Sequence, residues 1–172
     1  MKLKNMMIAT SAALALSYGA TSQATGSFSG CVATALVNFD GTVVDAALAT
    51  PELSTLVDAV VAAGLVDALN EAENITVFAP TNDAFDAVPT GILEAVLGDA
   101  GLLTTVLTYH VTPTRQDPRR WITARGANTL AGPRVFFHRK DGHARVNQAG
   151  VACEGVRTDN GIVWLIDSVL LP

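Results

Sequence analysis

The chain has 172 residues, of which 49% are hydrophobic and 16% are charged, and its formal net charge is −5 at pH 7. This apolar content excludes a disordered chain, and the length suits one domain with a sizeable core. The acidic balance argues against nucleic acid as the main partner, and the lack of an internal repeat argues against a tandem array.

The first 24 residues have the composition of a secretory signal. Lys2 and Lys4 supply a charged start, residues 6–16 are apolar, and residues 22–24 read Ser-Gln-Ala, a small-x-small cleavage site. The apolar stretch is too short and too interrupted to predict a membrane span, and no second long apolar run follows. We therefore expect an exported chain with a signal over residues 1–24, an N-terminal arm over 25–39 and no integral membrane span.

The arm carries Cys31, and the second cysteine of the sequence is Cys153. In the oxidising compartment that an exported chain reaches, an even number of cysteines favours pairing. A bridge would close a loop of about 120 residues and contribute up to ~4–5 kcal/mol in the chain-entropy model. The alternative is lipid attachment at Cys31, since residues 28–31 (Phe-Ser-Gly-Cys) loosely resemble a lipoprotein box, although they lie well past the apolar stretch.

Charge is distributed unevenly along the mature chain. Residues 25–114 contain eleven Asp or Glu and no Lys or Arg, whereas residues 115–172 contain nine basic and five acidic residues. We expect the two halves to neutralise each other in the folded domain.

The first part of the domain predicts a series of short helices. Residues 43–48 form an apolar helix-like stretch, and Thr50-Pro51-Glu52 combines a capping hydroxyl, a first-position proline and an acidic residue. The apolar residues that follow recur at three- and four-residue spacing and predict one buried stripe: Leu53, Leu56, Val57, Val60 and Val61. Gly64 ends or kinks that helix, and another begins at residue 65.

Residues 75–85 predict a strand that is followed directly by a helix. The strand residues alternate between two faces, with Ile75, Val77 and Ala79 on one and Thr76 and Phe78 on the other. Pro80 should end the strand because it lacks a backbone donor, and Thr81 can cap the helix. Phe85 can then fold back onto the strand, so apolar packing alone explains this strand-to-helix corner.

Further along, helices are predicted over residues 91–97, capped by Thr90, and over residues 100–108, capped by Asp99. The remainder of the chain is strand-like. One hairpin joins residues 134–139 to 143–147 through Asp141-Gly142, and a second turn at 159–161 separates strands at 150–156 and 162–171. Helices early and strands late predict an α+β domain.

Three segments resemble the fasciclin domain family: TVFAPTNDAF at residues 76–85, LTYHV at 107–111 and NGIVWLIDSVLLP at 160–172. Their order and separation also match that family, and the resemblance runs over residues 40–172. It implies a β-sheet wedge or sandwich with several short α-helices packed along it. Some bacterial secreted members are similar in having one cysteine ahead of the domain and another late in it, which implies a Cys31–Cys153 disulfide.

Tyr109 and His110 are the first candidate for a partner-binding site. In related animal adhesion proteins this stretch is implicated in integrin recognition, so the resemblance implies a partner-binding role. The alternative, which we favour, is that the hydroxyl and the imidazole form internal hydrogen bonds at a helix-to-strand junction.

Arg119, Arg120 and Trp121 are the second candidate. With Arg115 and Arg125 they predict a long surface loop, which departs from the family pattern. Arg and Trp are common interface anchors, so this loop could bind an acidic glycan or the acidic face of a protein. The alternative is a solvated loop that the acidic half of the domain neutralises.

The sequence contains little that predicts catalysis or metal binding. His138 and His143 could form a diagonal pair near Asp141, but the Arg and Lys residues around them oppose a cation. No nucleophile elbow, phosphate-binding glycine loop or zinc-protease motif is present. We expect no metal, no cofactor and no enzyme activity.

The fasciclin resemblance implies a monomeric, secreted or cell-surface binding module for adhesion or extracellular-matrix interaction, with a protein or glycan partner. The alternative is a periplasmic enzyme or small-ligand-binding protein with a pocket in the β-wedge.

Overall fold

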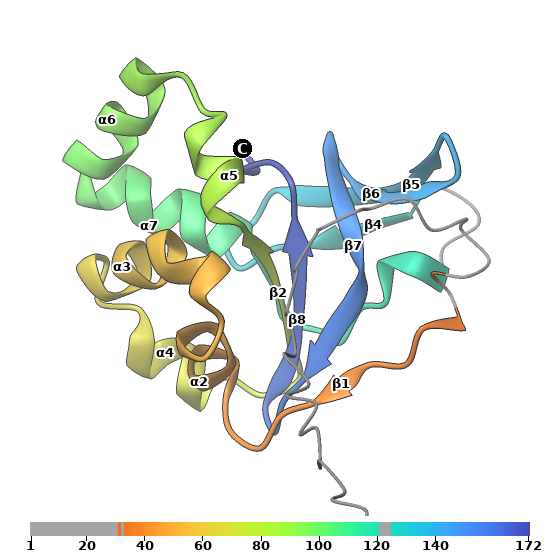
Figure 1. Cartoon of the computed structure of the whole chain (residues 1–172). Coiled ribbons are helices and arrows are strands. Elements are labelled where there is room, and N and C mark those ends of the chain that lie inside the picture. The colour runs from red at the N-terminus through yellow and green to blue at the C-terminus, as the bar shows by residue number, and fades with distance from the viewer. Residues whose placement is uncertain (1–30, 32, 121–124) are drawn as a thin grey trace, which may run out of the picture.

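The computed structural model describes Cys31, residues 33–120 and residues 125–172. These residues form a mixed β-sheet with short helices packed along it (Figure 1), which confirms the predicted α+β fold. The helices are α2 (Val43–Leu48), α3 (Ser54–Ala62), α4 (Val66–Glu71), α5 (Asn82–Asp86), α6 (Thr90–Gly98) and α7 (Ala100–Tyr109), with 3-10 turns η1 (Pro51–Leu53) and η2 (Pro118–Arg120). The strands are β1 (Val37–Asn38), β2 (Ile75–Pro80), β3 (Val111–Thr112), β4 (Arg125–Asn128), β5 (Arg134–Lys140), β6 (His143–Val146), β7 (Ala149–Arg157) and β8 (Gly161–Ile166).

The strand order is β3-β2-β8-β7-β6-β5-β4, and β1 pairs with β7 outside this path. β2 and β8 run parallel, as do β1 and β7, while the other neighbours are antiparallel. β7 belongs to both halves of the sheet, since its first residues pair with β6 and its later residues pair with β8. A register shift between Val151 and Gly155 interrupts the β7–β8 pairing, and such irregularities bend a strand.

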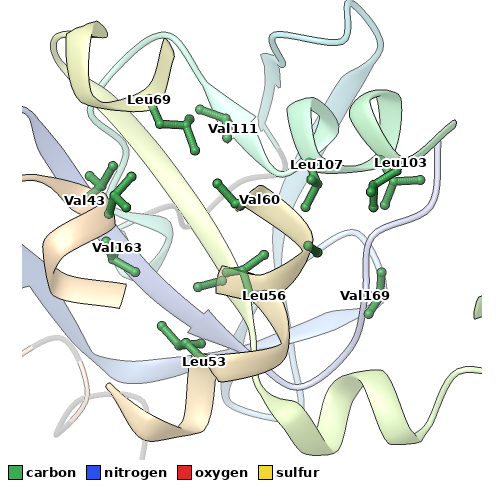
Figure 2. Packing of buried hydrophobic residues seen from close by; sticks show 14 of the residues in the cluster. Val43, Leu53, Leu56, Val60, Leu69, Leu103, Leu107, Val111, Val163 and Val169 are labelled. Atoms are coloured by element: carbon green, nitrogen blue, oxygen red, sulfur yellow. The ribbon is translucent and has the colours of Figure 1, made fainter. Parts of the chain in front are cut away.

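Two hydrophobic clusters fill the domain. The first lies between the helices and the β2–β8 part of the sheet (Figure 2), and it includes Val43 of α2, Leu56 of α3 and Val163 of β8. The second gathers side chains from both halves of the sheet, and the rings of Phe78 and Phe137 lie 5.7 Å apart within it. The bent sheet therefore has one apolar face covered by helices and the other folded onto itself.

The strand-to-helix corner is confirmed. Ile75 and Ala79 belong to the helix-side cluster and Phe78 to the other, as the alternation predicted. β2 ends at Pro80, and the Thr81 hydroxyl accepts a hydrogen bond from Ala84 N at 3.4 Å. The predicted Asp99 cap is confirmed as well: its side chain accepts hydrogen bonds from the first backbone N–H groups of α7.

Four local predictions were wrong. Val61, which was predicted to belong to the buried stripe of α3, is 60% exposed. The Thr50 hydroxyl donates to Ala46 O at 2.8 Å, a carbonyl left free at the end of α2, and does not cap η1. Thr90 lies inside α6, whose capping position is occupied by Pro89 without a side-chain bond. β8 ends at Ile166, before the predicted residue 171, because its pairing with β2 and β7 ends there; beyond it, Leu170 N donates to the His110 ring.

Among the described residues, no single helix is long and apolar enough to span a membrane. α6 and α7 meet that length and composition criterion only as a pair, which is bent by 108°.

Candidate functional site

The N-terminal arm is fixed to the sheet by a disulfide. Cys31 is bonded to Cys153 of β7, with their Cα atoms 4.8 Å apart, which confirms the predicted bridge. The sulfur of Cys31 is therefore part of the disulfide, whereas lipid attachment would require a free Cys31 thiol. Beyond Cys31 the arm follows β7, and Val37 and Asn38 pair in parallel with Val156 and Arg157.

Arg119 joins the arm, the disulfide and the sheet. Its Nη1 donates to the carbonyl oxygens of Cys31 at 3.1 Å, Thr34 at 2.7 Å and Cys153 at 3.0 Å. Its Nε and Nη2 donate to the two carboxylate oxygens of Asp117 at 2.9 and 3.0 Å. Arg119 is 3% exposed, so the prediction that it lies on a surface loop was wrong. The backbone carbonyls of the arm provide acceptors that the local sequence does not reveal.

The segment before Arg119 is held by the ends of the central strands. Gln116 N donates to the Thr76 hydroxyl at 2.8 Å, and that hydroxyl donates to Thr114 O at 2.9 Å. The indole Nε1 of Trp164 donates to Gln116 O at 3.0 Å. Thr76 and Trp164 are fully buried, so this segment is anchored by groups that have few other hydrogen-bond partners.

An open groove of about 570 Å³ lies between the arm and this segment. We call it the arm groove, and it is lined by Ala33, Thr34, Ala35, Leu36, Asn38, Arg115, Gln116, Asp117, Arg119, Arg120, Arg157 and Ile162. Three of its arginines are exposed: Arg115, Arg120 and Arg157.

The carboxylate of the arm groove is already paired. Asp117 binds Arg119 through both oxygens and also accepts from the Nε of Arg120 at 3.2 Å. Its charge is therefore compensated from within the domain, while the exposed guanidinium groups face solvent. Arginine forks of this kind bind carboxylate and sulfate groups through charge-assisted hydrogen bonds.

Tyr109 and His110 are buried at the junction between α7 and β3. The Tyr109 hydroxyl donates to Arg134 O at 3.1 Å and accepts from Asn147 Nδ2 at 3.0 Å. His110 Nδ1 lies 2.8 Å from Val106 O, and its Nε2 accepts from Leu170 N at 2.9 Å. These internal bonds match the alternative interpretation. Neither side chain lines the arm groove, and a role of this pair in partner binding stays a prediction.

Burial lowers the pKa of His110 to about 4, and its bond to Val106 O opposes this shift. The geometry agrees with a neutral ring, because Nε2 must be unprotonated to accept from Leu170 N while Nδ1 donates. His110 is therefore a structural residue of the junction.

The remaining predicted residues are spread over the domain. Arg120 lies on the rim of the arm groove, and Trp121 lies outside the described residues. His138 pairs with Arg145 and His143 with Lys140 across the hairpin, which is the predicted diagonal arrangement. In the part of the chain that the structure describes, no three His, Cys, Asp or Glu residues gather in a way that could hold a metal ion.

Sequence reasoning missed Arg157 and the arm as parts of the groove. Arg157 is separated from the arginines at residues 115–120 by nearly forty positions, and only the pairing of β1 with β7 brings it opposite Asn38. Its one sequence signal was a basic residue directly after the strand predicted at residues 150–156.

Comparison with known proteins shows which family this chain belongs to. A family model described as the Fasciclin domain matches residues 51–172. The chain is 42% identical over 133 residues to Protein sll1483 of Synechocystis sp. The aligned region covers 76% of this chain and 73% of that protein. It is 39% identical over 132 residues to the immunogenic protein MPB70 of Mycobacterium bovis, covering 74% of this chain and 67% of the relative.

Two further similarities concern a surface protein and a solved structure. The chain is 41% identical over 140 residues to the cell surface glycolipoprotein MPB83 of Mycobacterium bovis, covering 76% of this chain and 60% of that protein. A FAS1 domain pair from the insect cell adhesion molecule fasciclin I has the same fold, with a TM-score of 0.59 and 16% identity over 77% of this chain and 51% of that one. The chain belongs to the fasciclin domain family.

Proposed function

We propose that this chain is a secreted or cell-surface binding module that holds an acidic group of a protein or glycan in the arm groove and catalyses no reaction. Its relatives include a cell surface glycolipoprotein and, by fold, a cell adhesion molecule, which supports a role in adhesion. The observation that carries the proposal is the set of exposed arginines, Arg115, Arg120 and Arg157, around a carboxylate that is already paired.

The shape of the groove suits an extended acidic chain. The groove is open to solvent, so a polymer can reach it without threading into a closed cavity. Arg157 lies at the end of β7, and the Nη2 of Arg115 donates to Asp159 O at 3.2 Å, in the turn that follows β7. Because these groups are exposed, binding should be fast and should weaken as salt screens the charges.

Binding to two immobilised probes tests this proposal: polygalacturonate as an acidic glycan and poly-glutamate as an acidic peptide. Arg157→Glu should weaken binding roughly tenfold at low salt, because it removes a charge-assisted contact and adds repulsion. Arg139→Glu is the matched control, since it makes the same substitution at an exposed position outside the groove.

The two probes distinguish a glycan from a protein partner. Retention on polygalacturonate alone would favour a glycan, and retention on poly-glutamate alone would favour a protein. Binding to neither probe, or an equal loss in Arg157→Glu and Arg139→Glu, would contradict the arm groove as the binding site.

The sequence left open a pocket enzyme or a small-ligand protein. The smaller cavities found among the described residues lie between the helices and the sheet, and their lining is almost entirely aliphatic and aromatic. His110 borders two of them, but both of its ring nitrogens are engaged in hydrogen bonds. These contacts support binding over catalysis.

A further inference from the structure

The two oppositely charged halves of the sequence lie on different sides of the folded domain, which contradicts the expectation that they neutralise each other. Residues 25–114, which contain eleven acidic and no basic residues, supply all the helices from α2 to α7. The nine basic residues after residue 114 belong to the loop before β4 and to the strands from β4 onwards. In Figure 1 the helices lie on the left and β4, β5 and β6 on the right, so the domain has an acidic helical side and a basic strand side.

The helical side contains an apolar cavity of about 120 Å³ between α2, α3, α4 and β2. We call it the helical groove, and its lining is entirely aliphatic: Val43, Val44, Ala47, Leu48, Leu56, Val57, Val60, Val61, Val66, Leu69 and Val77. Figure 2 shows Val43, Leu56, Val60 and Leu69, which form its inner part.

Two large side chains of the helical groove remain in contact with solvent. Leu48 is 62% exposed and Val61 is 60% exposed. An apolar cavity of about 150 Å³ in another protein stays dry and binds benzene, so a cavity of this kind and size can accept an aromatic ring. The groove therefore offers a seat for an apolar side chain and two exposed aliphatic groups beside it.

Each of the three helices that line the groove also carries an exposed acidic residue. Asp45 on α2, Asp58 on α3 and Asp67 on α4 each directly follow a lining residue in the sequence. Hydrogen bonds from the backbone and the hydroxyl of Thr42 lower the pKa of Asp45, which keeps this carboxylate charged. A matching partner therefore presents an apolar anchor among basic groups.

The opposite side of the same molecule presents such a surface on β5. Phe136 is 52% exposed, and the Arg134 guanidinium lies 5.9 Å from the centre of its ring. His138 and Lys140 follow at two-residue spacing and share this face of the strand. We call these four residues the β5 face. Exposed Phe and Arg side chains together are typical of interface anchors.

We propose that the helical groove of one molecule binds the β5 face of a second copy of this chain. The Phe136 ring lies against Leu48 and Val61 at the mouth of the groove, and Arg134 and Lys140 face the carboxylates on α2, α3 and α4. One molecule cannot join its own two surfaces, because they lie on different sides of the rigid domain. Each copy therefore contacts two neighbours through different surfaces, and the assembly grows as an open chain.

The contact is small and depends partly on charge. Each surface has a single apolar anchor surrounded by exposed ionic groups, so association should be weak and should decrease in high salt. A monomer in dilute solution, as expected from the sequence, is compatible with this assembly at high local concentration.

Sedimentation velocity of the mature chain tests the proposal with two variants, Val61→Asp and Phe136→Ser. Both positions are more than half exposed, so circular dichroism melting should show both variants folded. The average mass of the natural chain should rise with concentration at low salt and fall at high salt. Each variant alone should stay monomeric, since it lacks one of the two surfaces.

A mixture of the two variants gives the decisive result. Val61→Asp keeps its β5 face and Phe136→Ser keeps its helical groove, so the mixture should form one-to-one dimers and no longer species. A natural chain that stays monomeric at millimolar concentration, a variant that still associates alone, or a mixture without dimers would each overturn the proposal. Arg157→Glu should associate like the natural chain, which separates this test from that of the arm groove.

Discussion

Arg119 lies against the indole of Trp164, with its guanidinium carbon 4.7 Å from the ring centroid. This pair connects the loop before β4 to the central strand β8, and the same guanidinium also bonds the arm and both cysteine carbonyls. A single buried cation therefore determines the position of one wall of the arm groove. The partner site proposed here depends on Arg119 through the shape of the groove.

Replacing Arg119 should be among the most destabilising single changes in the domain. Arg119→Ala leaves three carbonyl oxygens without this donor and removes the bidentate partner of the Asp117 carboxylate, so we expect a loss of about 3 kcal/mol in the free energy of unfolding. Urea denaturation measures it. Arg120→Ala is the control, because its exposed ion pair with Asp117 should contribute less than about 1 kcal/mol. Similar losses in both variants would contradict this role.

Breaking the disulfide should loosen the arm before it unfolds the domain. The bridge spans 122 positions, so Cys31→Ser with Cys153→Ser should lower stability by up to about 4–5 kcal/mol in the chain-entropy model. Hydrogen exchange at Val37 and Phe39 should rise much more than at Phe78, which is in the centre of β2. Unchanged protection of the arm in the double variant would show that Arg119 and β1 hold it without the bridge.

The stability of the domain should fall in mild acid because of His110. Its pKa falls from 6.5 to about 4 on folding, so between these pH values the unfolded chain binds a proton that the folded chain does not. The stabilising effect is therefore complete above pH 6.5 and decreases as the pH falls towards 4, by about 3 kcal/mol in total. Urea titrations from pH 7 to 4 measure it. In His110→Gln the slope over this range should become shallower, and an unchanged slope would exclude His110 as its source.

Asn160 should contribute more to stability than an ordinary turn residue. Its Nδ2 donates to Leu69 O at 2.8 Å and Ala72 O at 3.0 Å, and its Oδ1 accepts from Val43 N at 2.9 Å. Asn160→Ala should therefore cost about 2–3 kcal/mol, because buried groups of α2 and of the end of α4 lose their partner. Asn160→Asp should cost at least as much, since it places a carboxylate oxygen beside two carbonyls. Thermal melts of both variants check this order.

Local signals predicted much of the fold. The alternation from Ile75 to Ala79 fixed the two faces of β2, and Asp141-Gly142 fixed the β5–β6 hairpin, where both residues adopt positive φ angles of 51° and 78°. The pairing of Cys31 with Cys153 followed from the family resemblance and is confirmed. These features depend on neighbouring residues or on a recognisable pattern.

The candidate site was harder to predict, because its parts come from distant segments. Arg119 looked like a surface residue, since the acceptors that bury it are backbone carbonyls of Cys31, Thr34 and Cys153. Backbone carbonyls have the same chemistry at every position, so the sequence does not show which of them will meet an arginine. Arg157 could be assigned to the groove only once β1 was known to pair with β7.

The sequence by itself determined the α+β class, the strand-to-helix corner after β2 and the hairpin of β5 and β6, because periodicity and turn residues are local properties. Only the tertiary structure decided that Arg119 is internal while Arg115, Arg120 and Arg157 are exposed around one groove. Whether an arginine is exposed depends on which segments pack over it, and that is set by strand pairing and the disulfide across more than a hundred residues.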